Sequence, residues 1–125
     1  MRLEPILHTP MSGLIYKICP KSLWSAAEAA GRFEGAPVDR ADGYIHFSAE
    51  GQVRETAARH FSGQSGLVLV AVDAAALGDD LRWEPSRGGD LFPHLYAPLP
   101  MSAVRHVEEL PFGPDGSHAF PPSIP

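Results

Sequence analysis

The stretch Asp42-Gly43-Tyr44-Ile45-His46-Phe47-Ser48 decides how the rest of this chain is organised. Side chains on a strand alternate between its two faces, so the stretch predicts a strand with Ile45 and Phe47 on an apolar face. The other face then carries an aromatic ring, an imidazole and a hydroxyl, all able to form hydrogen bonds, from Tyr44, His46 and Ser48. Such a row is typical of a cleft wall, and we predict a functional site on this face.

The residues that follow predict a helix that begins beside this site. Between Glu50 and Phe61 the apolar residues recur at every fourth position, at Val53, Ala57 and Phe61, which indicates an amphipathic helix. Ser48 is placed to act as its N-cap. A strand that leads into the start of a helix is also a place where an anion can be held.

The other elements follow from apolar patterns and from proline and glycine. Lys17 stands in the middle of the first strand pattern, which indicates either an edge strand or a ligand contact. A helix is expected over residues 20–30, a loop over 33–41, and a turn that Asp73 caps after a strand buried on both faces. The expected strands are 14–18, 42–48, 67–72, 81–84, 92–96 and 104–110.

These elements predict a single α+β domain with two helices and a mixed or antiparallel twisted sheet of about five to six strands. Residues 14–110 form this domain. Residues 1–13 have no periodicity and are expected to be a flexible leader, with Met11 as an alternative start. Residues 111–125 are rich in proline, glycine and serine and are expected to be a poorly ordered tail.

Composition excludes several classes of protein. The net charge is −5, and only two of the ten basic residues are lysines, which excludes general nucleic-acid binding. The lone cysteine, Cys19, forms no internal disulfide, and no segment has the pattern of a membrane span or a secretory signal. We therefore expect a cytoplasmic protein, without a membrane partner, that acts on a small molecule.

Polar residues on several predicted strands suggest three kinds of site. His46, Glu84 and His94 offer donors for a divalent metal, but no HxH or HxxxH pair fixes their geometry. Ser48 with a histidine and Glu84 offers a nucleophilic triad, without the glycine pattern of a nucleophile elbow. A pocket for a nucleotide or another phosphorylated molecule requires the least special geometry.

We predict that this pocket uses no metal and that His46, Glu84 and His94 are its catalytic residues. The predicted ligand-binding residues are Lys17, Tyr44, Ser48, Gln52, Arg82 and Tyr96. The alternative interpretation is that these groups bond to one another and keep a small fold rigid.

Four motifs in this order resemble those of the bacterial domain-of-unknown-function 952 family, over about residues 14–110. They are Ile15-Tyr16-Lys17-Ile18, Asp42-Gly43-Tyr44-Ile45-His46-Phe47-Ser48 with Gln52, Leu81-Arg82-Trp83-Glu84, and Phe92-Pro93-His94-Leu95-Tyr96. That family in turn resembles the ADP-ribosyltransferase-like fold, in which a first-strand His or Arg grips NAD and a late strand often carries a Glu. Here Lys17 stands at the first position, His46 at an aromatic position, and the late strand, near His94, has no Glu.

The resemblance implies an ADP-ribosyltransferase-like enzyme that acts on NAD or a related phosphorylated nucleotide, with NAD as substrate rather than as resident cofactor. Two alternatives from other classes remain open. One is a non-catalytic binding module for such a ligand, and the other is a structural domain without a ligand.

Overall fold

The structure is a computed structural model that describes residues 13–125. It confirms a single α+β domain with antiparallel sheets. The strands within these residues are β1 Leu14–Pro20, β2 Arg32–Phe33, β3 Ile45–His46, β4 Ser48–Ala49, β5 Leu67–Asp73, β6 Leu81–Ser86, β7 Asp90–Leu95, β8 Leu99–Pro100 and β9 Val104–Glu109. The α-helices are α1 Lys21–Ala30, α2 Pro37–Asp42 and α3 Val53–His60, and the 3-10 helices are η2 Ala74–Asp80, η3 Arg87–Gly89 and η4 Met101–Ala103.

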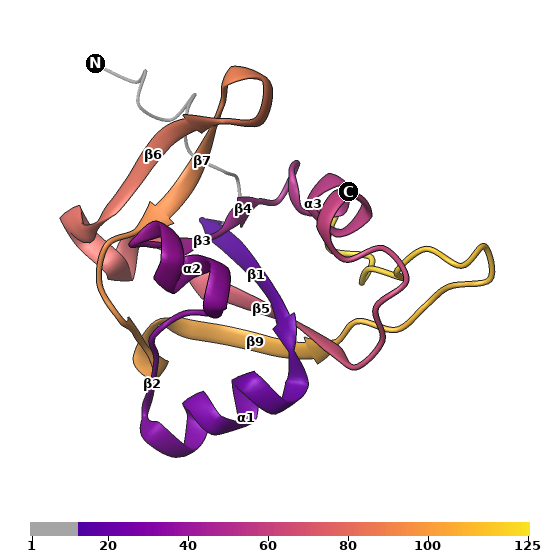
Figure 1. Cartoon of the computed structure of the whole chain (residues 1–125), viewed down its shortest axis with the longest axis horizontal. Helices are drawn as coiled ribbons and strands as arrows, with labels where there is room; N and C mark the ends of the chain where they lie inside the picture. The colour runs from indigo at the N-terminus through magenta and orange to yellow at the C-terminus, as the bar shows by residue number, and fades with distance from the viewer. Residues whose placement is uncertain (1–12) are drawn as a thin grey trace.

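The largest sheet has four strands in the order β4-β1-β5-β9 (Figure 1). Its centre is the pair of β1 and β5, which match residue for residue from Leu14 with Asp73 to Pro20 with Leu67. Six consecutive residues of β5 are buried, as expected for a strand covered on both faces. A central β1 has one direct consequence for the site: Lys17 lies inside the fold and not on an edge strand.

The two faces of this sheet carry separate apolar clusters, because side chains alternate along β1 and β5. On one face, Trp24 and Ala27 of α1 pack with Val70 and with Phe47 and Leu95 of the smaller sheet. On the other face, α3 and the C-terminal segment provide the cover. Figure 1 shows α1 and α3 on different sides of the sheet.

The second sheet has three strands in the order β3-β7-β6, and the β6–β7 hairpin projects from the domain (Figure 1). His94 on β7 lies between His46 on β3 and Arg82 on β6, since the register pairs it with both. The same face continues to Glu84, which lies opposite Phe92. This face therefore places the predicted polar residues next to one another.

The structure differs from the sequence prediction in the number of elements. Within residues 13–125 there are nine strands in three sheets, where one sheet of about five to six strands was expected. Four of the strands have only two residues, too few to produce a periodic pattern. The loop expected over residues 33–41 contains part of β2 and most of α2, a short helix that Pro37 begins.

The prediction that Ser48 is the N-cap of α3 is wrong. The helix begins later, at Val53, and Gln52 occupies the cap position without a side-chain cap bond. Ser48 instead belongs to β4 and pairs with Tyr16 of β1. Pairing with a distant strand has therefore overridden the local preference of serine for a helix start.

The segment after Pro111 lies against the domain, although its composition suggests poor order. Ile124 is 2% exposed and packs with α3, and Arg54 donates hydrogen bonds to the main-chain oxygens of Ile124 and Pro125. His118 is buried and hydrogen-bonds to the carbonyl of Gln64. The flexible leader expected before residue 14 lies almost wholly outside the described residues.

Candidate functional site

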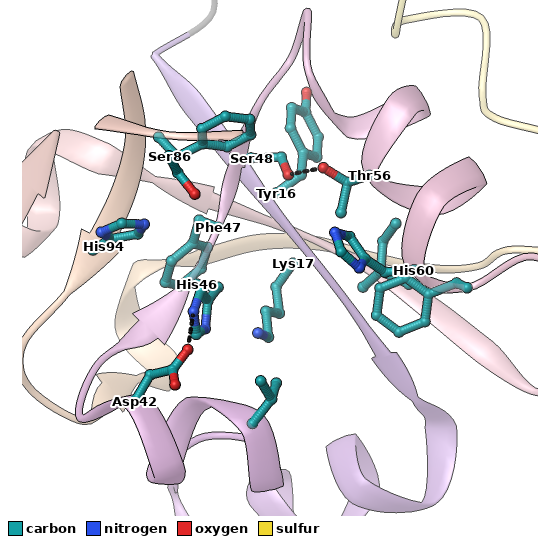
Figure 2. Close-up of a pocket in the computed structure, with 14 residues that line it drawn as sticks. Tyr16, Lys17, Asp42, His46, Phe47, Ser48, Thr56, His60, Ser86 and His94 are labelled. Atoms are coloured by element: carbon teal, nitrogen blue, oxygen red, sulfur yellow. Dashed lines mark hydrogen bonds and ion pairs between the residues drawn. The ribbon is translucent and has the colours of Figure 1, made fainter. Parts of the chain in front are cut away.

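A cavity of about 520 Å³ opens where the chain passes from one sheet to the other (Figure 2). The amide of Phe47 donates to Pro93 of β7, whereas the next residue, Ser48, already pairs with β1. No residue of β4 therefore pairs with β1 at Lys17, and this edge of β1 borders the cavity. The lining residues are Tyr16, Lys17, Ile18, Val38, Asp42, His46, Phe47, Ser48, Thr56, His60, Phe61, Ser86, Phe92 and His94.

Lys17 is a buried cation in this lining, held by Asp39 of α2. Its Nζ lies 2.9 Å from each oxygen of the Asp39 carboxylate, and the two residues are 6% and 1% exposed. Burial lowers the pKa of the Lys17 amine, and the charge of Asp39 offsets that effect only in part. Of the two interpretations of Lys17, the solvent-facing edge lysine is therefore wrong, because a partner 22 residues away allows it to be buried.

Asp39 is the centre of a chain of charged groups. Besides Lys17, its carboxylate contacts Nδ1 of His46 at 2.6 Å and accepts hydrogen bonds from the amides of Ala36 and His46. Burial raises the pKa of the Asp39 carboxyl, but the His46 hydrogen bond and the Lys17 charge outweigh it and lower the pKa to about 2. Asp39 is therefore ionised whenever the fold is intact at neutral pH.

His46 lies between two carboxylates. Its Nδ1 faces Asp39, and its Nε2 lies 2.9 Å from Asp42, the contact drawn in Figure 2. Both ring nitrogens can donate at once only when the imidazole carries a proton on each. In this arrangement His46 links the buried Lys17–Asp39 pair to Asp42, whose side chain is 46% exposed.

A second histidine, His94, is oriented by Glu84. The Nδ1 of His94 lies 2.7 Å from Oε1 of Glu84, and the hydroxyl of Tyr96 donates to the same oxygen at 2.7 Å. These hydrogen bonds, that of His94 first, lower the pKa of the Glu84 carboxyl. Glu84 thus stays ionised and fixes the ring orientation of His94, while that ring lines the cavity (Figure 2).

Aromatic rings cover the outer side of His94. The ring of Tyr44 stacks on His94 with centroids 4.2 Å apart, and it also contacts the rings of His46 and Tyr96. The guanidinium of Arg82 lies 4.8 Å from the centre of the Tyr96 ring. Tyr44, Tyr96 and Arg82 therefore enclose His94 from outside and do not line the cavity.

Ser48 and Gln52 have partners that limit their roles. The hydroxyl of Ser48 lies 2.7 Å from that of Thr56, so Ser48 is bonded to a hydroxyl of α3. Gln52 accepts a hydrogen bond from the Ala49 amide and donates one to the carbonyl of Leu91. Gln52 thus ties α3 to the β6–β7 hairpin, a positioning contact at the rim of the site.

The structure brings together four of the nine predicted site residues in one cavity: Lys17, Ser48, His46 and His94. Glu84 reaches the cavity through His94. Sequence reasoning missed Asp39, Asp42, Thr56 and His60 as site residues. Two signals pointed to Asp39: a lysine in an apolar strand needs a buried counter-charge, and Pro37 with Asp39 two residues later is typical of a helix start.

Among residues 13–125, no three His, Cys, Asp or Glu side chains are placed to share a metal ion. The helices of this part of the chain are all too short or too polar to cross a membrane.

Comparison with known proteins identifies relatives of similar structure. The family model described as "Protein of unknown function (DUF952)" matches residues 18–107. The crystal structure of protein CC0527 from Caulobacter crescentus is 56% identical, with a TM-score of 0.81 over 85% of this chain and 93% of that one. The solution NMR structure of CC0527 is also 56% identical, with a TM-score of 0.76 over 84% and 90% of the two chains. None of the curated proteins matches.

Proposed function

This chain belongs to the DUF952 family, and we propose that it binds a small nucleotide-like molecule in the cavity and uses His94, with Glu84, as an acid–base group. The observation that carries the proposal is the hydrogen bond of 2.7 Å between Nδ1 of His94 and Glu84. It favours the tautomer with the proton on Nδ1, which leaves Nε2 as the acceptor.

A histidine held in this way suits general acid–base chemistry. Nε2 can take a proton from water or from a ligand hydroxyl, and the ionised Glu84 stabilises the imidazolium that forms. The stacked ring of Tyr44 keeps bulk water away from the outer face of His94. His46, by contrast, has a carboxylate at each nitrogen, and its role is to hold Asp39 in place beside Lys17.

The lining supports a ligand with a planar ring and several oxygen atoms. A volume of about 520 Å³ is within the range of roughly 300–1,000 Å³ that is usual for small-molecule sites. Tyr16, Phe61 and Phe92 offer apolar surface for a base or a nicotinamide ring. Lys17 and the hydroxyl of Ser86 offer donors for sugar or phosphate oxygens.

NAD is the first ligand to test, because it combines these groups and because the family resembles the ADP-ribosyltransferase-like fold. In this chain His94 occupies the late strand, β7, where that fold often carries a Glu, and Glu84 acts from the neighbouring strand, β6. The proposal therefore gives the acid–base role to the histidine. A protein that binds the nucleotide without converting it is the second candidate.

Calorimetric titration with NAD, ADP-ribose, AMP and nicotinamide, combined with an assay of nicotinamide release, tests the proposal. We expect one ligand to bind, and at one hundred times its Kd to stabilise the fold by about 2.7 kcal/mol. His94→Ala should weaken binding by roughly ten- to a hundredfold, the effect of one hydrogen bond to a charged group. The matched control is His106→Gln on β9, where the side chain is exposed.

The outcomes separate the candidates. Binding with nicotinamide release that His94→Ala abolishes supports the enzyme, and binding without release supports the binding module. If none of the four compounds binds, or if His94→Ala binds as tightly as the parent protein, the proposed function is wrong.

A further inference from the structure

We propose that Lys17 is a nucleophile that forms an imine with a small aldehyde or ketone in the cavity, a role that rests on the cavity being the small-molecule site proposed above. The chain has two lysines, Lys17 and Lys21. Lys21 is exposed and pairs with Glu109 on the surface, whereas Lys17 lies in the cavity wall. A lysine placed on a central strand and facing an open cavity is a costly arrangement for structure alone.

The amine has a hydrogen that the protein does not use. Nζ of Lys17 contacts the two oxygens of Asp39, and an ammonium carries three N–H donors. In the described part of the chain, no other acceptor lies within hydrogen-bonding distance of Nζ. The remaining donor position is therefore available to a group in the cavity, and a carbonyl oxygen is such a group.

A route for the proton of the ammonium leads through the chain of charged groups to the half-exposed Asp42. Asp39 accepts from Nζ and shares its Oδ1 with His46, and His46 contacts the half-exposed Asp42. When the His46 ring carries its proton on Nε2, Asp39 can take a proton from Nζ and pass it to Nδ1 of His46, while Nε2 gives its own proton to Asp42 and water, which leaves a neutral amine. Burial, which lowers the pKa of Lys17, acts in the same direction.

The reaction needs an acid as well as an amine, and His94 lines the same cavity. The amine nitrogen attacks the carbonyl carbon, a C–N bond forms, and the C=O electron pair moves to oxygen, which takes a proton from the His94 imidazolium. The nitrogen of this carbinolamine loses a proton to water. His94, protonated again from solvent, donates to the hydroxyl, which leaves as water when the C=N bond forms. The balance is amine plus carbonyl plus one proton, which solvent supplies through His94, giving the protonated imine plus water.

Reductive trapping on the unaltered chain tests this inference. The protein is incubated with glycolaldehyde, pyruvate or ribose 5-phosphate and sodium cyanoborohydride at neutral pH, and the labelled peptides are quantified by mass spectrometry. Lys21 is the internal control, because its side chain is 60% exposed and within reach of the probes, although it pairs with Glu109. We expect at least one probe to label Lys17 faster than Lys21, at a rate that saturates as the probe concentration rises.

The outcomes separate the imine inference, the role of His94 and the nucleotide proposal. Faster labelling of Lys21 than of Lys17 with all three probes overturns the inference, as does a Lys17 rate that rises linearly without saturation. His94→Gln should slow the labelling of Lys17 and leave that of Lys21 unchanged, and equal rates in parent and variant overturn the role given to His94. If nucleotides bind by calorimetry and Lys17 is not trapped, the imine inference alone fails. If Lys17 is trapped and no nucleotide binds, the nucleotide proposal alone fails.

Discussion

Replacing Asp39 by Asn leaves the Lys17 ammonium buried without its counter-charge. The side chain of Asp39 is 1% exposed, and its carboxylate holds Lys17, His46 and the Ala36 amide together. Removing one partner of a buried ion pair typically costs about 3–5 kcal/mol. Since a folded domain is stable by only about 5–15 kcal/mol, Asp39→Asn should remove a large part of the total.

Urea unfolding followed by circular dichroism measures this loss, and two further variants show its origin. Asp42→Asn removes a carboxylate from the same histidine, but on the half-exposed side, where an ion pair contributes about 0–1 kcal/mol. Lys17→Met combined with Asp39→Asn removes both charges, and it should be more stable than Asp39→Asn alone. The reasoning is refuted if Asp39→Asn and Asp42→Asn lower the free energy of unfolding by the same amount. It is also refuted if the double variant lowers it by the sum of the losses measured for Asp39→Asn alone and for Lys17→Met alone.

Three other predictions follow from the same contacts and from the C-terminal segment. Because the pKa of Asp39 falls from 3.8 to about 2 on folding, its ionisation stabilises the fold by about 2 kcal/mol above about pH 4, and this stability is lost as the pH falls towards 2. The difference in melting temperature between parent and Asp39→Asn should therefore shrink in acid. A difference that stays constant with pH would contradict this. Gly35→Ala should destabilise more than Gly43→Ala in urea unfolding, because both glycines have positive φ but only at Gly35 would the new Cβ lie 2.9 Å from Cβ of Asp39; equal losses would exclude that collision. Ile124→Ala should cost about 2–5 kcal/mol, against less than about 0.5 kcal/mol for Val38→Ala at a 57% exposed position, and equal effects would support the expectation of a dispensable tail.

The sequence predicted the elements whose residues follow a regular pattern. The apolar run of β5 and the helix that begins after Pro20 and ends before Gly31 both appear in the structure. Tyr44 and His46 share a face of the structure, as their rings contact each other and the ring of His94. Local alternation is enough for such features, since each residue constrains its neighbours.

Features that depend on distant contacts were not predictable in this way. Asp39 lies in a stretch with Gly35 and Pro37 that has the composition of a loop, and its importance comes from Lys17, which is 22 residues away. Trp83 alternates with Arg82 and Glu84, a pattern that predicts an inward-facing side chain, but it is exposed on the β6–β7 hairpin. Which face of a strand is buried depends on what packs against it, and that is decided by the whole fold.

The passage of the chain between the two sheets through Phe47 alone has a consequence for the evolution of this protein. One inserted residue between His46 and Ser48 would turn one of them to the opposite face of its strand, because side-chain direction reverses at every step. One deleted residue would force Ser48 off β1 or His46 away from His94. Relatives of this chain can therefore gain or lose residues at the Arg87–Gly89 turn, which ends in exposed glycines, whereas the spacing between Ile45 and Ala49 has to stay constant for the site to exist.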